Sequence, residues 1–223
     1  MKKIYLAIVA LSFFTTFTQS QSVVGIGISG AYLSPTGDFG DVYKDGWGGF
    51  ASLNFNLSDN FQLSLTSGYS QFQFNNDRYN QLLNDFFNFF GISTYVNITS
   101  SLRIIPVMLG GKYFFTNTPF RPYAEADLGI DVVSVDGATI IIDSQSINAA
   151  TGESKIYSAW SAGAGFMYQI SKSVNLDVNA KFNGNNLSAG TNFSTSIGSS
   201  TSSESSNSSV TFWSVNAGFL FEL

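Results

Sequence analysis

Hydrophobic and polar residues alternate along most of this chain with the period of two that is typical of β-strands. In VNLDVNAKFN, at 174–183, every even-numbered residue is apolar and every odd-numbered residue is polar or charged. Successive side chains of an extended strand point to opposite faces, so this segment has one apolar and one polar face. Further segments with the same alternation predict an all-β chain. They are 23–33, 47–57, 61–74, 102–115, 122–135, 156–170 and 210–223.

The connections between these segments are alternately long and short. The long ones are 34–46, 75–101, 136–155 and 184–209, and the short ones are 58–60, 116–121 and 171–173. An up-and-down barrel that crosses a membrane has short turns on one side and long loops on the other, whereas a soluble sandwich has no reason to separate them. The pattern therefore predicts an eight-stranded antiparallel up-and-down transmembrane β-barrel with long extracellular loops. In such a barrel the apolar faces meet lipid and the polar faces line a narrow lumen.

Large aromatic residues occupy two levels of the predicted strands. Trp47, Trp160 and Trp213 lie toward the long loops, and Tyr168, Phe219 and Phe221 lie toward the short turns. Two such levels are typical of the aromatic girdles that mark the two interfaces of a bilayer. The alternative is that these residues are ordinary core aromatics.

The first residues have the pattern of a secretory signal peptide. Lys2 and Lys3 precede an apolar run at 4–14, and small polar residues follow. The run is too short for a spanning helix. We expect a signal peptide at 1–20, cleaved after Ser20 or alternatively after Ser22, and a single barrel domain at 21–223. An uncleaved anchor is the weaker alternative, because the residues after the apolar run are polar.

The composition favours a membrane protein or one with a large apolar interface. The chain contains 22 Phe and no Cys, only 11% of its residues are charged, and its formal net charge is −5. A surface so poor in charge is unusual for a soluble protein. An acidic chain without a basic patch is a poor candidate for nucleic-acid binding, and no disulfide framework is available.

The sequence contains no His, which excludes Ser-His-Asp hydrolysis, His-ligated metals and the commonest general base. We therefore expect no enzymatic activity, no catalytic residue, no cofactor and no metal site. The acidic stretch GDFGDVYKDG, at 37–46, lacks the regular spacing of a calcium loop. A solvated acidic loop is the favoured interpretation, and a cation site is the alternative.

Charged residues on the polar faces are the candidate site. If the turn at 116–121 closes a hairpin, Lys112 lies opposite Glu125, and buried charges need partners. We predict a Lys112–Glu125 ion pair within a network that acts as a structural plug or, alternatively, as a selective gate. A catalytic carboxylate pair is conceivable by spacing, but a barrel of eight strands leaves little room for a sugar. The other charges assigned to this lumen network are Asp127, Asp131, Asp177, Lys181 and Glu222.

One stretch of the long connection 75–101 departs from the period of two. Apolar residues within 78–90 recur at helical spacing, which predicts an amphipathic helix in the loop. Such a helix could cap the barrel or lie on the membrane, or it could recognise a partner. Its apolar residues are Tyr79, Leu82, Leu83, Phe86, Phe87 and Phe90.

Three motifs resemble those of the outer-membrane β-barrel family common in Bacteroidetes. They are AYLSPTGDF at 31–39, IPVMLGGKYFF at 105–115 and RPYAEADLG at 121–129. The resemblance covers nearly the whole mature chain and implies a small porin-like barrel in the outer membrane of a Gram-negative bacterium.

Three functions remain open. The first is a structural or surface-interaction role through the extracellular loops. The alternatives are a narrow channel for ions or small solutes, and a component of a secretion or motility machine. The expected partners are outer-membrane lipid and an extracellular protein or glycan, and the chain is expected to be a monomer.

Overall fold

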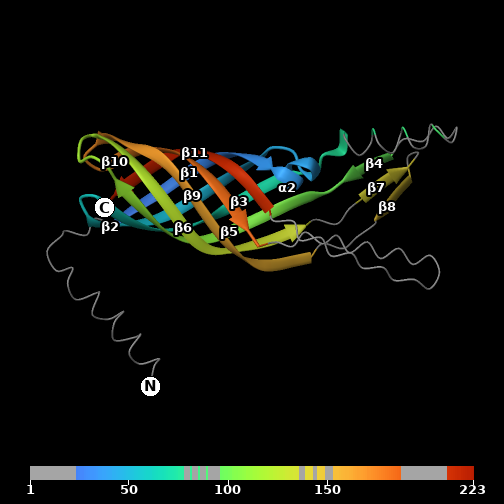
Figure 1. Cartoon of the computed structure of the whole chain (residues 1–223), viewed down its shortest axis with the longest axis horizontal. Helices are drawn as coiled ribbons and strands as arrows, with labels where there is room; N and C mark the ends of the chain where they lie inside the picture. The colour runs from blue at the N-terminus through green and yellow to red at the C-terminus, as the bar shows by residue number, and fades with distance from the viewer. Residues whose placement is uncertain are drawn as a thin grey trace, which may run out of the picture.

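The computed structural model describes residues 24–77, 81, 85, 89, 96–135, 139–142, 145–148, 153–186 and 210–223. Within these residues the chain forms a closed antiparallel barrel with the strand order β1-β11-β10-β9-β6-β5-β3-β2 (Figure 1). This confirms the predicted eight-stranded barrel, and each predicted strand agrees with an observed one to within about three residues. The strands are β1 (Val24–Thr36), β2 (Gly46–Ser58), β3 (Phe61–Gln73), β5 (Ser101–Phe114), β6 (Phe120–Val135), β9 (Glu153–Ser171), β10 (Val174–Asn185) and β11 (Val210–Glu222).

The apolar faces of the strands point outward. On the outer surface, Leu128 is 71% exposed and Ile28 is 53% exposed. On the polar faces, Gln62 and Asn54 are buried inside the barrel. The alternation along each strand therefore gives the inverse of a soluble protein, with an apolar exterior and a polar middle.

The connections divide between the two ends of the barrel as predicted. The turns between β2 and β3, β5 and β6, and β9 and β10 are short and lie at the end where β11 finishes. Figure 1 shows the helix and the short strands that lie in the described parts of three long connections at the opposite end.

Three of the long connections contain regular structure that the sequence analysis did not predict. The first contains a short helix, α2 (Gly37–Val42), where a solvated loop was expected. The next two contribute β4 (Val96–Thr99), β7 (Thr139–Ile142) and β8 (Gln145–Asn148), which form a separate sheet in the order β4-β7-β8. This sheet projects beyond the long-loop end of the barrel (Figure 1). Segments of four to six residues are too short to show a clear period, which is why the pattern missed them.

Apolar side chains form a buried cluster toward each end of the barrel interior, which the expectation of a narrow polar lumen did not include. The loop-side cluster consists of Leu33, Phe39, Phe72, Leu102, Ile104, Val133, Val210 and Phe212. The turn-side cluster consists of Phe114, Tyr123, Met167 and Leu220. The charged lumen residues lie mainly between the two clusters, while buried Asn175 and Asn185 lie beside the turn-side and loop-side clusters respectively. An alternating pattern shows which face of the sheet each side chain occupies. It does not show which side chains of other strands lie next to it inside the barrel, so it could not predict the two clusters.

Two predictions fall on residues outside the described part. The signal peptide at 1–20, with both candidate cleavage positions, is one of them. The other is the apolar face of the loop helix, with Tyr79, Leu82, Leu83, Phe86, Phe87 and Phe90. Among the described residues, no helix is long and apolar enough to cross a bilayer.

Candidate functional site

The polar middle of the lumen contains a charge cluster made by Lys112, Glu125, Asp127, Asp177 and Lys181. These residues come from inward-facing positions of β5, β6 and β10, where register places Lys112 opposite Glu125. Lys112, Glu125 and Asp127 are each less than 10% exposed. Alternation thus brings charges that are far apart in the sequence to one wall of the barrel.

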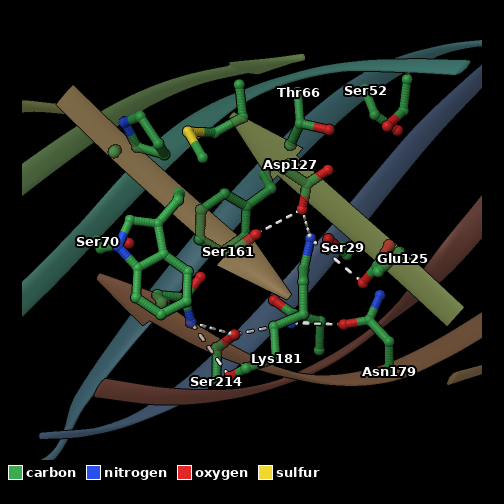
Figure 2. Close-up of a pocket in the computed structure, with 18 of the residues that line it drawn as sticks. Ser29, Ser52, Thr66, Ser70, Glu125, Asp127, Ser161, Asn179, Lys181 and Ser214 are labelled. Carbon is green, nitrogen blue, oxygen red and sulfur yellow. Dashed lines mark hydrogen bonds and ion pairs between the residues drawn. The ribbon is translucent and has the colours of Figure 1, made fainter. Parts of the chain in front are cut away.

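Each lysine of the charge cluster bridges two carboxylates. Lys112 Nζ lies 3.9 Å from Glu125 Oε2 and contacts Asp177. Lys181 Nζ lies 3.4 Å from Glu125 Oε1 and 3.3 Å from Asp127 Oδ2. The predicted Lys112–Glu125 ion pair is confirmed, but it is the longest of the four contacts, and Lys181 holds Glu125 more closely. Figure 2 shows Lys181 extended between Asp127 and Glu125.

Neutral residues complete the charge cluster, and the sequence analysis missed them. The Tyr123 hydroxyl donates a hydrogen bond to Asp177 and accepts one from Asn179 Nδ2 at 3.1 Å. Ser161 Oγ donates to Asp127 Oδ2 at 2.5 Å. Tyr123 and Ser161 lie at inward-facing positions next to predicted lumen charges. Their place in the alternating pattern was the signal by which the sequence could have identified them. Hydrogen bonds of this kind satisfy carboxylate oxygens that the lysines leave free.

Glycines make room for the charged side chains. A Cβ on Gly110 would lie 1.7 Å from Asp127 Oδ1, and a Cβ on Gly163 would lie 2.8 Å from Lys181 Cγ and 2.2 Å from the backbone oxygen of Ala180. Both glycines face cluster residues across the sheet, since Gly110 pairs with Asp127 and Gly163 pairs with Lys181. Their small size is therefore part of the site.

Two of the predicted lumen charges lie outside these ion pairs. Asp131 is buried nearer the loop-side cluster and accepts a hydrogen bond from Asn185 Nδ2 at 2.9 Å. Glu222 is half-buried near the end of β11, beyond the turn-side cluster. Both side chains belong to the polar faces as predicted, but neither contributes to the charge cluster.

A cavity of about 100 Å³ lies beside the charge cluster. Its opposite wall is formed by small polar residues of β1, β2 and β3, among them Ser29, Ser52 and Thr66 (Figure 2). This volume counts positions open to the centre of a water molecule, and about 10–15 Å³ of such space suffices for one water, so the cavity has room for several waters.

The carboxylates of the acidic stretch at 37–46 do not meet at a common site. Asp45 accepts hydrogen bonds from the Tyr32 hydroxyl and, at 3.1 Å, from Ser34 Oγ. Asp38 lies in the first turn of α2. Among the residues that the structure describes, no group of three or more acidic residues is arranged to hold a metal ion.

The family of the chain follows from a comparison with known protein families. The family described as outer membrane protein beta-barrel domain matches residues 6–221. The chain belongs to this family. The geometry agrees, because the closed barrel and its apolar exterior are what an outer-membrane barrel requires.

Comparisons with individual proteins are more limited. The chain is 32% identical to the outer membrane protein PagN of Salmonella typhimurium over 94 residues, which is 42% of this chain. That match spans only 39% of the length of PagN. Among solved structures, Neisserial surface protein A aligns with a TM-score of 0.53 and 14% identity, covering 90% of this chain and 97% of that one. OprG of Pseudomonas aeruginosa aligns with a TM-score of 0.48 and 13% identity, covering 92% and 98% respectively. Neisserial surface protein A supports the fold.

The aromatic residues predicted to form girdles face the surface that this outer-membrane barrel presents to lipid. All six are at least 40% exposed, which excludes the alternative that they are core residues. The Phe182 ring lies between Trp160 and Trp213. Its centroid is 5.8 Å from that of Trp160 and 5.2 Å from that of Trp213. The six residues are Trp47, Trp160, Trp213, Tyr168, Phe219 and Phe221.

Proposed function

We propose that this outer-membrane barrel is an anchor that displays its extracellular loops to a protein or glycan partner, and that the barrel itself does not conduct. The observation that carries the proposal is the filling of the lumen. The loop-side and turn-side clusters lie toward its two ends, and the charge cluster lies between them beside the cavity. A pore needs a continuous hydrated path, and buried apolar side chains remove water from a path.

The proposed partner surface is the β4-β7-β8 sheet. It is made by two different long connections and projects away from the barrel end (Figure 1). Strands β6 and β9, at 16 and 19 residues, are longer than the other barrel strands, and they precede β7 and follow β8 in the sequence. A rigid body that carries loops of variable sequence is a common arrangement for recognition.

The remaining parts of the proposal concern export, chemistry and assembly. The signal peptide at 1–20 directs export through the inner membrane, and the motifs quoted above favour a barrel of the Bacteroidetes type. We infer no enzymatic role, because the sequence contains no His and the Lys112 and Lys181 ammonium groups hold the carboxylates of the charge cluster. In this proposal the barrel is a monomer surrounded by outer-membrane lipid, and it does not bind nucleic acid.

A loop replacement tests the recognition role. Replacing residues 139–148 by a Gly-Ser linker of equal length removes β7 and β8 without changing any barrel strand. We expect cells that display this variant to lose the binding that wild-type cells show on a glycan array or on immobilised extracellular-matrix proteins. A linker at the short turn 116–119, at the other end of the barrel, is the matched control and is expected to leave binding intact. Equal binding by all three proteins would contradict the proposal.

A further inference from the structure

The outer wall of the barrel carries three aromatic side chains close together on β1, β2 and β3. Tyr32 on β1 is 55% exposed and pairs in register with Trp47 on β2, which is 59% exposed. The ring centroid of Tyr69 on β3 lies 6.0 Å from that of Trp47. These three residues, which we call the aromatic patch, therefore lie side by side on three neighbouring strands.

A carboxylate borders the aromatic patch on its loop side. Asp45 directly precedes β2 and is exposed. It accepts hydrogen bonds from the Tyr32 hydroxyl and, at 3.1 Å, from Ser34 Oγ. An ionised carboxylate has about four acceptor positions on its two oxygens. Asp45 can therefore accept further hydrogen bonds from a ligand while it keeps both hydroxyl partners.

The charge of this carboxylate is not neutralised by a lysine or arginine within the part of the chain that the structure describes. Lys44 is next to Asp45 in the sequence, but its Nζ is paired with Asp77 at 2.5 Å. The side-chain partners of Asp45 are uncharged hydroxyls. A negative charge attracts a cation, and so do the faces of Trp and Tyr rings. Asp45 and the aromatic patch are therefore complementary to the same kind of ligand.

The position of the aromatic patch decides which cation it meets. The patch lies on the outer wall near the ends of the strands that lead to the long loops, which is the extracellular side of an outer-membrane barrel. Nearer the turns, the same wall presents Ile28 and Leu53, which are 53% and 42% exposed. A lipid of the outer leaflet places its acyl chains on such an apolar wall and its headgroup at the level of the aromatic residues.

We propose that Asp45 and the aromatic patch bind the ammonium group of a lipid headgroup. The ammonium lies against the faces of the rings and donates a hydrogen bond to Asp45, while the acyl chains lie on the apolar wall below. A headgroup whose only charge is an acidic phosphate is disfavoured, because the carboxylate repels it. This site is on the outside of the barrel and is separate from the sheet proposed above as the partner surface.

A competition between two lipids tests the proposal. The refolded barrel is transferred to micelles that contain equal amounts of phosphatidylethanolamine and phosphatidylglycerol with the same acyl chains, and native mass spectrometry counts the lipids that it retains. Both headgroups contain the phosphate, and only the first contains an ammonium. We expect the wild-type protein to retain phosphatidylethanolamine about fivefold more often, because an exposed ring and an exposed carboxylate each contribute a weak attraction. Equal retention, or more phosphatidylglycerol, would overturn the proposal.

Soluble phosphoethanolamine distinguishes a lipid from a free amine. At the concentration of the lipid it is expected not to compete, because it makes no contact with the apolar wall. Displacement of the lipid at that concentration would assign the site to a soluble amine and overturn the proposal of a lipid ligand.

Two pairs of variants separate this site from an ordinary aromatic girdle. Asp45→Asn and Trp47→Leu are each expected to make the retention of the two lipids nearly equal. Asp38→Asn removes another exposed acidic charge of the same loop, and Trp160→Leu removes a girdle residue whose ring lies against Phe182 on β10. These matched controls are expected to keep the wild-type preference.

Heat-modifiable gel mobility verifies that each variant is folded. An unchanged preference in Asp45→Asn or in Trp47→Leu would overturn the proposal. An equal loss in Trp160→Leu would also overturn it, because the preference would then belong to the girdle as a whole.

Discussion

Replacing Lys112 with Met is expected to lower the free energy of unfolding by about 3–5 kcal/mol, which is the usual cost of removing one partner of a buried ion pair. Lys112 is 7% exposed and contacts two carboxylates, Asp177 and Glu125. Met has a similar volume, so the loss comes from the charge and not from a cavity. After the substitution, Asp177 keeps only the hydroxyl of Tyr123 among the partners described above.

Lys44→Met is the matched control for this substitution. Lys44 also forms an ion pair, with Asp77 at 2.5 Å, but the two side chains are 42% and 83% exposed. Exposed pairs contribute about 0–1 kcal/mol. Urea unfolding in lipid vesicles, followed by tryptophan fluorescence, measures both variants. A Lys112→Met variant as stable as Lys44→Met would contradict a structural role for the charge cluster.

A double substitution checks that the effect is pairwise. In Lys112→Met combined with Asp177→Asn, the carboxylate left unpaired by the first change is itself neutralised. We therefore expect the double variant to be more stable than the sum of the two single effects predicts, as residues in direct contact usually show.

Replacing Gly163 with Ala has the second large expected effect. The new Cβ would lie 2.2 Å from the backbone oxygen of Ala180 and 2.8 Å from Lys181 Cα, so β9 and β10 cannot keep their present register without a shift. Overpacking of this kind costs about 1–3 kcal/mol. The shift also moves Lys181 relative to Glu125 and Asp127, so we place the expected loss at the upper end of that range.

Gly30→Ala is the control for the glycine substitution. Gly30 is on the outer face of β1, and a Cβ there has no atom within 4 Å. In a strand this change is expected to be neutral or stabilising by about 0.4–1 kcal/mol, because alanine reduces the freedom of the unfolded chain. The same unfolding measurement compares the two variants. Equal stability of Gly163→Ala and Gly30→Ala would show that the space at Gly163 does not matter.

The fold was predictable from the sequence because a barrel strand repeats its signal at every second residue. Each strand has twelve or more residues, which places about six or more on each face, and the lengths of the connections give the order of turns and loops. The pair of Lys112 and Glu125 was also predictable, since a short turn fixes the register of the hairpin that contains both. Local pattern and short sequence separation were sufficient in these cases.

The contacts inside the barrel were less predictable, because side chains that touch there come from strands far apart in the sequence. β5 shows the difficulty. Its inward residues are apolar at Leu102 and Ile104, charged at Lys112 and apolar again at Phe114, so its pattern alternates less clearly than that of the other strands. Only the closed barrel shows that these residues belong to two separate clusters. Phe39 was missed for a similar reason, since a single buried residue on a six-residue helix leaves no period to detect.

Single-channel conductance of the refolded mature protein in planar bilayers tests the central claim most directly. Folding is verified by heat-modifiable gel mobility before each recording. The structure predicts a silent bilayer for the wild-type protein, because an apolar cluster lies toward each end of the lumen and the charge cluster lies between them. Discrete openings whose size or selectivity changes in Lys112→Met would contradict it, and would make the lumen charges the functional site of a channel.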